Sequence, residues 1–188
     1  MVICLPLREI IDVNCYLYAD EASKHGFLID PGAQGDRLLA WIREQGFVIE
    51  KILLTHGHFD HIGAVRDLAE PDTRIVIHAL DAPMLADPAL NAGQGLLRRA
   101  VTAPEATDLV KEGDEPEFAG LKGKVLHTPG HTPGSVCYPI EGELFTRDTL
   151  FDYGWGRTDL PGGSEEQMAA SLRRLAPLVK TYPMHAGH

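Results

Sequence analysis

The sequence predicts an α/β fold in which two β-sheets pack together and helices cover their outer faces. Apolar strand patterns gather in two clusters, one in the first thirty residues and one in the second half of the chain. Only a few helical patterns separate these strands, which disfavours a doubly wound parallel sheet. The 188 residues, 44% of them hydrophobic, suffice to bury a core, and we expect one domain over residues 1–188.

The first half is expected to begin with a strand meander that closes at the turn Asp30-Pro31-Gly32. Apolar residues at helical spacing predict a helix over 35–45, which Gly46 would end. A second helical pattern begins just beyond His61, and a short helix is expected over 81–86. The expected strands of this half are 2–7, 14–19, 26–29, 51–54 and 74–78.

The second half begins with a stretch, 87–107, that has no clear period, so we expect a long loop that could be a lid or contact substrate. A helix is expected over 164–175, because two glutamates in its first turn complement the helix dipole. The expected strands are one around Leu109 and those at 124–127, 136–140, 144–146 and 179–182.

Composition argues against several classes of partner. A formal net charge of -10 disfavours nucleic acid and anionic membranes, which require a basic face. Three cysteines without CxxC spacing predict neither a disulfide framework nor a thiolate zinc site, so a cytoplasmic location is expected. The N-terminus lacks a basic segment leading into a long apolar run, and no membrane span is expected. The sequence does not determine the oligomeric state.

The segment Thr55-His56-Gly57-His58-Phe59-Asp60-His61 carries four potential metal ligands in six positions, directly after a predicted buried strand. His56 and His58 can point to the same side of extended backbone, and Asp60 and His61 fall where the chain turns into a helix. The four side chains can therefore divide between two neighbouring metals. A lone histidine is usually a hydrogen-bonded or surface residue, but this clustering predicts metal binding.

Three later segments offer further ligands. Two Pro-Gly pairs bracket His131, and such a rigid turn holds one ligand still. Asp148 follows a predicted strand, where a carboxylate can reach two metals and neutralise part of their charge. His185 and His188 both follow the final predicted strand, and one of them would suffice. His127 is better explained as a structural residue at a strand end.

These motifs together resemble the metallo-β-lactamase superfamily, and the resemblance runs from the turn at Asp30 to the terminal histidine. It implies an αββα sandwich of two mixed β-sheets flanked by helices. It also implies one metal site of His56, His58 and His131, and a second of Asp60, His61 and His188, with Asp148 as the bridging carboxylate. His188 matches the family's closing Gly-His because Gly187 precedes it, whereas Met184 precedes His185. The expected cofactors are two divalent ions, zinc first, with iron and manganese as alternatives.

The segment Gly156-Arg157-Thr158-Asp159-Leu160-Pro161-Gly162-Gly163 is similar to that of small glyoxalase II-like proteins, the hydroxyacylglutathione hydrolases. This implies hydrolysis of a small thioester or related ester. A water held between the metals would lose a proton more easily and attack the carbonyl, whose oxygen one metal polarises. Asp60 and Asp148 are the expected catalytic residues, because they would orient that water.

Substrate contacts are less well defined. Tyr153 and Trp155, in the loop after Asp148, could line the pocket and select an acyl group, although a loop packed on its own aromatics explains them equally well. Relatives that use glutathione thioesters carry an additional C-terminal helical domain with substrate-binding cations, and we expect no such domain here. The replacement candidates are Arg98, Arg99, Arg147 and Arg157, for which solvated surface or ion pairs are the simpler explanation.

Two features depart from the family pattern. Arg147 stands where the family usually has glycine before the bridging aspartate, and a bulky cation there could alter the turn or narrow the pocket. The chain stops at His188, whereas relatives usually continue, so we expect a truncated or unusual C-terminus.

Two other functions remain open. Mononuclear iron persulfide dioxygenases resemble this sequence, also carry Gly-Arg-Thr-Asp, and use two histidines and an aspartate. The presence of Asp60, His61 and His188 favours the dinuclear hydrolase. The third interpretation is a metal-binding protein without turnover. Nuclease activity is disfavoured by the charge. Hydrolysis of β-lactams is disfavoured by the Gly-Arg-Thr-Asp segment and by the expectation that the chain has no signal peptide.

Overall fold

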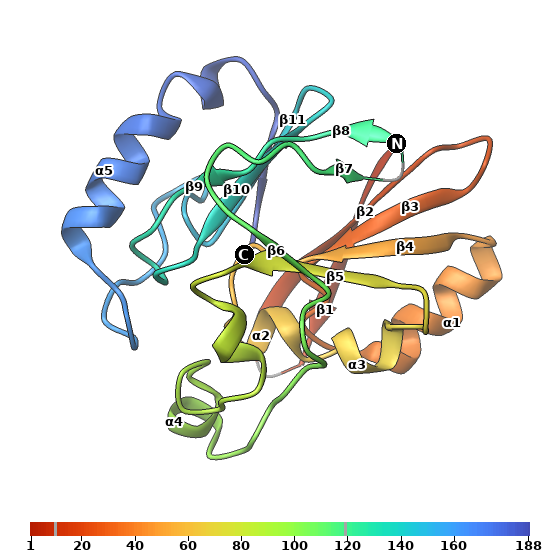
Figure 1. Cartoon of the computed structure of the whole chain (residues 1–188), viewed down its shortest axis with the longest axis horizontal. Coiled ribbons are helices and arrows are strands. Elements are labelled where there is room, and N and C mark those ends of the chain that lie inside the picture. Colours follow the sequence, from red (N-terminus) through yellow and green to blue (C-terminus); the bar gives the residue numbers. More distant parts are fainter. Residues whose placement is uncertain (10, 119) are drawn as a thin grey trace.

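Two β-sheets lie face to face in the computed structural model, which describes residues 1–9, 11–118 and 120–188, and helices cover their outer faces (Figure 1). The first sheet has the strand order β1 (Val2–Arg8), β2 (Asp12–Ala19), β3 (His25–Ile29), β4 (Val48–Leu53), β5 (Arg74–His78) and β6 (Asp108–Val110). The second has the order β12 (Met184–Ala186), β11 (Glu143–Arg147), β10 (Val136–Ile140) and β9 (Leu126–His127). The expected αββα sandwich is confirmed.

Both sheets are mixed. In the first, β1, β2 and β3 pair antiparallel, whereas β3, β4, β5 and β6 pair parallel. In the second, β11 pairs antiparallel with β10 and parallel with β12. Parallel pairs need a crossover between their strands, and the crossover from β3 to β4 is the helix α1 (Gly35–Gln45).

Side chains of the first sheet alternate between two hydrophobic cores. Along β3, Phe27 and Ile29 enter the core between the sheets, whereas Leu28 enters the core beneath the helices α1, α2 (Phe59–Ile62) and α3 (Val65–Leu68). A sheet buried on both faces explains why β3 is apolar from Gly26 to Ile29, beyond the exposed His25. A third, smaller cluster packs the second sheet against α5 (Glu165–Leu175), on the opposite side of the sandwich (Figure 1).

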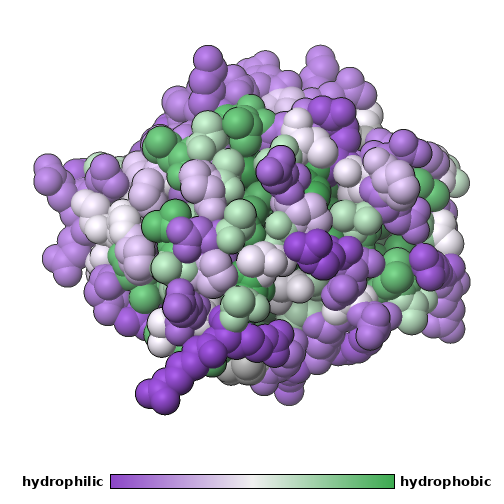
Figure 2. Space-filling model, turned by 60° about the horizontal axis from the view of Figure 1, so that its bottom comes forward, coloured by the Kyte–Doolittle hydropathy of each residue, from purple (hydrophilic) through white to green (hydrophobic). Residues whose placement is uncertain are grey.

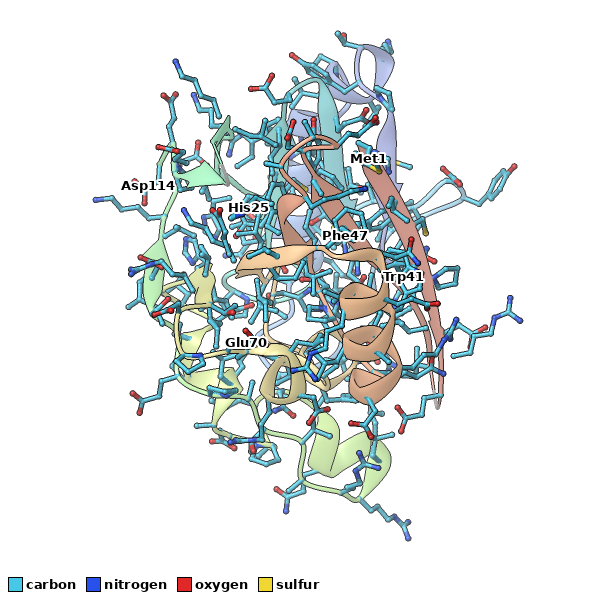
Figure 3. All side chains as sticks on the ribbon, turned by 90° about the vertical axis from the view of Figure 1, so that its right-hand side faces the viewer. Met1, His25, Trp41, Phe47, Glu70 and Asp114 are labelled. Atoms are coloured by element: carbon cyan, nitrogen blue, oxygen red, sulfur yellow. The ribbon has the colours of Figure 1, made fainter. Side chains whose placement is uncertain are left out.

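Helix α1 has the predicted bounds. Leu38 and Ile42 face the core, and Gly46 ends the helix in the left-handed conformation at φ 74°. Glycine adopts that conformation without the steric cost that a Cβ brings. Trp41 on the helix stacks on Phe47 just beyond it, with ring centroids 5.7 Å apart, beside β4 (Figure 3).

The helix expected beyond His61 is two short helices, α2 and α3, and α2 begins before His61. The turn 30–32 packs against the break between them: the Ala64 amide donates to the Pro31 carbonyl at 2.9 Å. A Cβ on Gly32 would lie only 1.5 Å from the Asp60 carbonyl oxygen. Glycine is therefore required where the first turn meets the segment 55–61.

The prediction of a strand over 179–182 is wrong. This stretch holds the 3-10 helix η2 (Leu178–Lys180), and the strand β12 lies further on, at Met184–Ala186. The apolar residues Val179 and Tyr182 pack against the cluster beneath α5 instead of joining the sheet. Proline lacks the amide hydrogen of a strand interior, so the strand begins beyond Pro183, whose carbonyl accepts from the Leu144 amide at 2.9 Å.

Smaller differences concern the connecting segments. The loop expected at 87–107 contains a short helix, α4 (Gly93–Leu97), and the expected helix at 81–86 is the 3-10 helix η1 (Ala82–Leu85). A two-stranded hairpin, β7 (Glu117–Phe118) with β8 (Leu121–Lys122), was not predicted. Among the residues that the structure describes, no helix is long and apolar enough to cross a bilayer.

Candidate metal centre

The seven predicted ligands meet at one edge of the sandwich, where loops leave strands of both sheets. His56, His58, Asp60 and His61 follow β4 of the first sheet. From the second sheet come one ligand between β9 and β10 and one after each of β11 and β12, namely His131, Asp148 and His188. Loops at strand ends can hold polar side chains together without exposing the strands themselves.

His56, His58 and His131 form the first cluster, with one nitrogen of each ring lying within 4.8 Å of the others. His58 Nδ1 and His131 Nε2 are 2.8 Å apart, so both rings present a nitrogen to the same point. All three residues are buried.

Asp60, His61 and His188 form the second cluster, again within 4.8 Å. Asp148 lies between the two clusters: its Oδ2 is 3.6 Å from His131 Nε2 and 3.2 Å from His188 Nε2, and its Oδ1 is 3.3 Å from His61 Nε2. The structure therefore brings together all seven residues that the sequence nominated. His185 lies apart from them, with its Nε2 2.7 Å from Glu143 Oε2 and its ring stacked on Phe145.

Nε2 of His56, His58 and His61 and Oδ1 of Asp148 are buried without a hydrogen bond in the described part of the chain, although His61 Nε2 and Asp148 Oδ1 lie 3.3 Å apart. His58 faces its cluster with Nδ1, so the atoms that point into the clusters are those of His56, His61 and Asp148. Leaving buried polar atoms unpaired is costly, and proteins rarely do so without a reason. Nitrogen and carboxylate donors of this kind suit zinc, iron or manganese. The donor set and its unpaired atoms fit a pair of divalent cations.

Hydrogen bonds to the other ring nitrogen fix three of the imidazoles. His61 Nδ1 donates to Asp30 Oδ2 at 2.9 Å, and His131 Nδ1 donates to the Arg157 carbonyl at 2.7 Å. His56 Nδ1 donates to the Thr55 hydroxyl at 3.2 Å. Each bond places the ring's free lone pair on Nε2, which is the arrangement that a metal ligand needs.

Ionisation favours coordination in the first cluster. Burial, together with the neighbouring imidazoles, holds the pKa of His56 and His58 well below the usual value, so both are neutral. Burial also opposes protonation of His61, but Asp148 and Asp60 outweigh it and raise its pKa to about 10 in the metal-free protein. A proton and a metal therefore compete for His61, and metal binding would release that proton.

Two supporting aspartates were not predicted as site residues. Asp30 was assigned only to a turn, yet it is fully buried and orients His61. Asp81, also fully buried, accepts from the Gly57 amide at 3.2 Å, the Thr132 hydroxyl at 2.6 Å and the Gly134 amide at 2.6 Å. It thus ties the His56–His58 loop to the loop of His131. The only sequence hint was the placement of each carboxylate just after an apolar strand.

Two other residues occupy structural positions. His127 donates from Nε2 to the Pro133 carbonyl at 2.8 Å and stacks on His78, away from the clusters. Arg147 does not narrow the pocket, because its side chain is fully buried and its Nε donates to Asp30 Oδ2 at 2.7 Å.

A cavity of about 280 Å³ opens onto the clusters, and its apolar wall includes Ile11, Phe59, Leu96, Phe151 and Leu160. Figure 2 shows hydrophobic residues gathered near the middle of the lower face of the molecule, with hydrophilic residues around them. Tyr153 and Trp155 do not line this cavity as expected: Tyr153 is fully exposed and Trp155 is 60% exposed. A bridge between Phe151 and Gly154 turns the loop outward, so Phe151 supplies the wall instead.

A second cavity of about 380 Å³ adjoins the first and shares Ile11, Phe59 and Asp60 with it. Its lining includes Arg37 and Arg99. Of the four arginines nominated from the sequence, Arg157 lines the metal cavity and Arg99 the adjoining one, whereas Arg98 and Arg147 line neither.

Known proteins are similar to this chain in sequence and in fold. The sequence model described as the Metallo-beta-lactamase superfamily matches residues 9–184. The probable metallo-hydrolase YqgX of Bacillus subtilis is 38% identical over 184 residues, which cover 95% of this chain and 85% of the relative. The hydroxyacylglutathione hydrolase GloC of Haemophilus influenzae is 36% identical over 199 residues, which cover 96% of this chain and 89% of the relative.

Solved structures agree with the fold. BLEG-1 B3 metallo-beta-lactamase superposes with a TM-score of 0.94 at 35% identity, covering 100% of this chain and 91% of that one. TTHA1623 in a di-iron-bound form gives 0.84 at 35% identity, covering 99% and 91%. ETHE1 from Myxococcus xanthus gives 0.77 at 30% identity, covering 99% and 75%.

Proposed function

Because this chain belongs to the metallo-beta-lactamase superfamily, we propose that it is a metallohydrolase that cleaves small thioesters of the hydroxyacylglutathione type. The observation that carries the proposal is the pair of ligand clusters that meet at Asp148, with unpaired buried atoms pointing at both. We propose two divalent ions, zinc first, held by His56, His58, His131, Asp148, Asp60, His61 and His188. The 36% identity to GloC supports the thioester as substrate.

The bound ions would polarise the substrate carbonyl and lower the pKa of a water molecule. Asp60 and Asp148 line the same cavity and, as acceptors, orient that water toward the carbonyl carbon. Burial would raise the pKa of Asp148, but His61 and the other histidines outweigh it and keep the carboxylate ionised. The new C–O bond replaces the C–S bond, and the products are a carboxylic acid and a thiol.

Each of the two cavities would bind one part of the substrate. The 280 Å³ cavity beside the clusters has an apolar wall and a volume that suits a small acyl group. The adjoining cavity is lined by Arg99 and Arg37 but also by Glu9, Asp36, Asp60 and Asp67, so the carboxylate-bearing thiol half would have to bind at one of the two arginines. Arg157 stands at the first cavity but already forms a two-point ion pair with Asp159, at 2.6 and 2.7 Å. Arg99 is therefore the better candidate for the substrate carboxylate.

The test combines elemental analysis of protein prepared without added metal with hydrolysis of lactoylglutathione. We expect two metals per chain, and turnover that is lost in His58→Ala. His185→Gln is the matched control, because His185 lies three positions from His188 but pairs with Glu143. Its activity should stay within about twofold of the wild type, since the partly buried His185–Glu143 pair lies apart from the seven predicted ligands and single ion pairs contribute little. Metal-loaded protein that leaves the thioester intact would refute the proposal.

Two further assays on the same preparation test the alternatives. The likeness to BLEG-1 calls for a cephalosporin reporter, and β-lactam hydrolysis without thioesterase activity would replace the proposed substrate. A single bound iron with oxygen uptake in the presence of a persulfide would instead support the dioxygenase. Stoichiometric metal without any turnover would support a metal-binding protein.

A further inference from the structure

We infer that Arg147 is a positioning residue for the Asp60, His61 and His188 cluster, acting through Asp30 and through the end of strand β12. The inference rests on the proposed metal binding, but not on the substrate. Arg147 is fully buried and touches none of the seven ligands through a hydrogen bond in the described part of the chain. Its effect must therefore pass through the groups that it holds.

The backbone of Arg147 marks it as unusual. Its φ of 48° lies in the left-handed region, where glycine is favoured and a Cβ carries a steric cost. An arginine here also has to bury its charge, which is costly unless the charge is well paired. Its Nη2 is buried without a partner in the described part of the chain. Such an arrangement is a poor source of stability, so orientation of its partners is the better explanation.

The first partner is Asp30, whose Oδ2 accepts from Arg147 Nε at 2.7 Å. The same carboxylate accepts from the Thr55 amide at 2.8 Å, the Thr55 hydroxyl at 2.6 Å and His61 Nδ1 at 2.9 Å. Asp30 stands near enough to His56 and His61 to be a ligand itself. Three of these four donors meet Oδ2 and one meets Oδ1, so the carboxylate is already engaged by protein donors and its role toward His61 is to orient the ring.

The second partner is the chain just before His188. Arg147 Nη1 donates to the Ala186 carbonyl at 3.2 Å, and the Tyr16 hydroxyl donates to the same oxygen at 3.0 Å. The guanidinium lies 5.2 Å from the centre of the Tyr16 ring, which also stabilises the cation. Arg147 therefore hydrogen-bonds both to Asp30, which orients His61, and to Ala186, which lies two residues before His188. Both of these histidines belong to the same cluster.

The three-histidine cluster depends on other supports. His131 is held by the Arg157 carbonyl, and the loops of His58 and His131 are tied by Asp81. Apart from its chain neighbour Asp148, which both clusters share, Arg147 reaches this cluster in the described part of the chain through Asp30 and the Thr55 hydroxyl, which lies beside His56. Loss of Arg147 should therefore weaken one metal much more than the other.

The experiment compares Arg147→Met, which keeps length without the charge, with wild type and with Leu144→Ala. Leu144 is buried in the same strand but packs in the cluster beneath α5, so its variant reports general destabilisation. Cobalt(II) is titrated into metal-free protein and followed by its absorption spectrum, and His58→Ala and His188→Ala assign the two binding events. We expect Arg147→Met to weaken the His188-dependent event by about tenfold or more, the usual effect of removing a supporting group. The other event should change by less than about threefold.

A second measurement uses no metal. The proton on His61 Nδ1, which is hydrogen-bonded to Asp30, should give a downfield NMR resonance in the metal-free wild type and in Leu144→Ala. It should be lost or moved in Arg147→Met. Equal weakening of both cobalt events, or an unchanged resonance together with unchanged affinities, would overturn the inference. Neither measurement uses a thioester, so absence of hydrolysis would count against the proposed function alone.

Discussion

At the scale of single residues, Asp148 links the two ligand clusters. A carboxylate has two oxygens, and here one faces His61 while the other faces His131 and His188, at 3.2 to 3.6 Å. Among the other side chains, only glutamate combines two acceptor oxygens with a negative charge, and it is one methylene group longer. Small movements of Asp148 would therefore disturb both clusters together.

Gly187→Ala tests this dependence. A Cβ at position 187 would lie 2.1 Å from Asp148 Oδ1, so the carboxylate or the terminal segment must move. We expect a loss of metal affinity of about tenfold or more, measured by competition with a chromophoric chelator. Gly95→Ala is the control, because nothing lies within 4 Å of its Cβ and it sits in helix α4. Unchanged affinity in Gly187→Ala would mean that this packing does not constrain the site.

At the scale of secondary-structure elements, strand and helix ends place the site residues. The metal-binding motif follows β4 directly, and α5 begins where its loop packs against the loop of His131. A Cβ on Gly130 would lie 2.4 Å from the Met168 amide nitrogen, and the Ser164 amide donates to the Gly130 carbonyl at 2.8 Å. The start of α5 thus supports the turn next to His131.

Ser164→Ala tests how that helix begins. The Ser164 hydroxyl accepts from the Gln167 amide at 3.3 Å as the N-cap of α5. Removing such a cap costs about 1 kcal/mol of unfolding free energy, which urea denaturation would detect. Ser164→Asp supplies another good cap and should recover most of the loss. Equal destabilisation in both variants would show that the capping hydrogen bond is not the cause.

At the scale of the whole molecule, the ligands come from both sheets, and one hydrophobic core lies between the sheets. That core joins Phe27, Ile29 and Leu53 of the first sheet to Tyr138 and Phe145 of the second. Bound metals would therefore hold together two halves that are already packed against each other. We propose that the chain unfolds as one cooperative unit.

Metal removal tests this arrangement by calorimetry with and without a chelator. A ligand at 100 times its dissociation constant stabilises the folded state by about 2.7 kcal/mol, which corresponds to roughly 5–10 °C for a chain of this size. We expect one transition in each case, at lower temperature after chelation and restored by added zinc. Two separate transitions would contradict a single unit, and an unchanged midpoint would contradict metal binding by the folded state.

The sequence alone determined the fold class and nominated the seven predicted ligands, which the fold brings together. Hydrophobic periodicity located most strands and the helices α1 and α5, because each depends on neighbouring residues. The predicted ligands between 56 and 61 were recognisable for the same reason, since four of them fall within six positions. Even here, the strand expected at 179–182 was wrong, because packing beneath α5 outweighed local strand propensity.

Tertiary structure decided what supports those ligands. Arg147 and Asp30 are 117 positions apart, and Asp81 and Thr132 are 51 apart, so no local pattern relates them. The outward turn at Phe151, which leaves Tyr153 and Trp155 exposed, likewise depends on a bridge within the folded loop. The chemical type of a side chain determines what it can bind. Its partners are determined by the packing of the two sheets, because this packing brings the ends of distant strands to one edge.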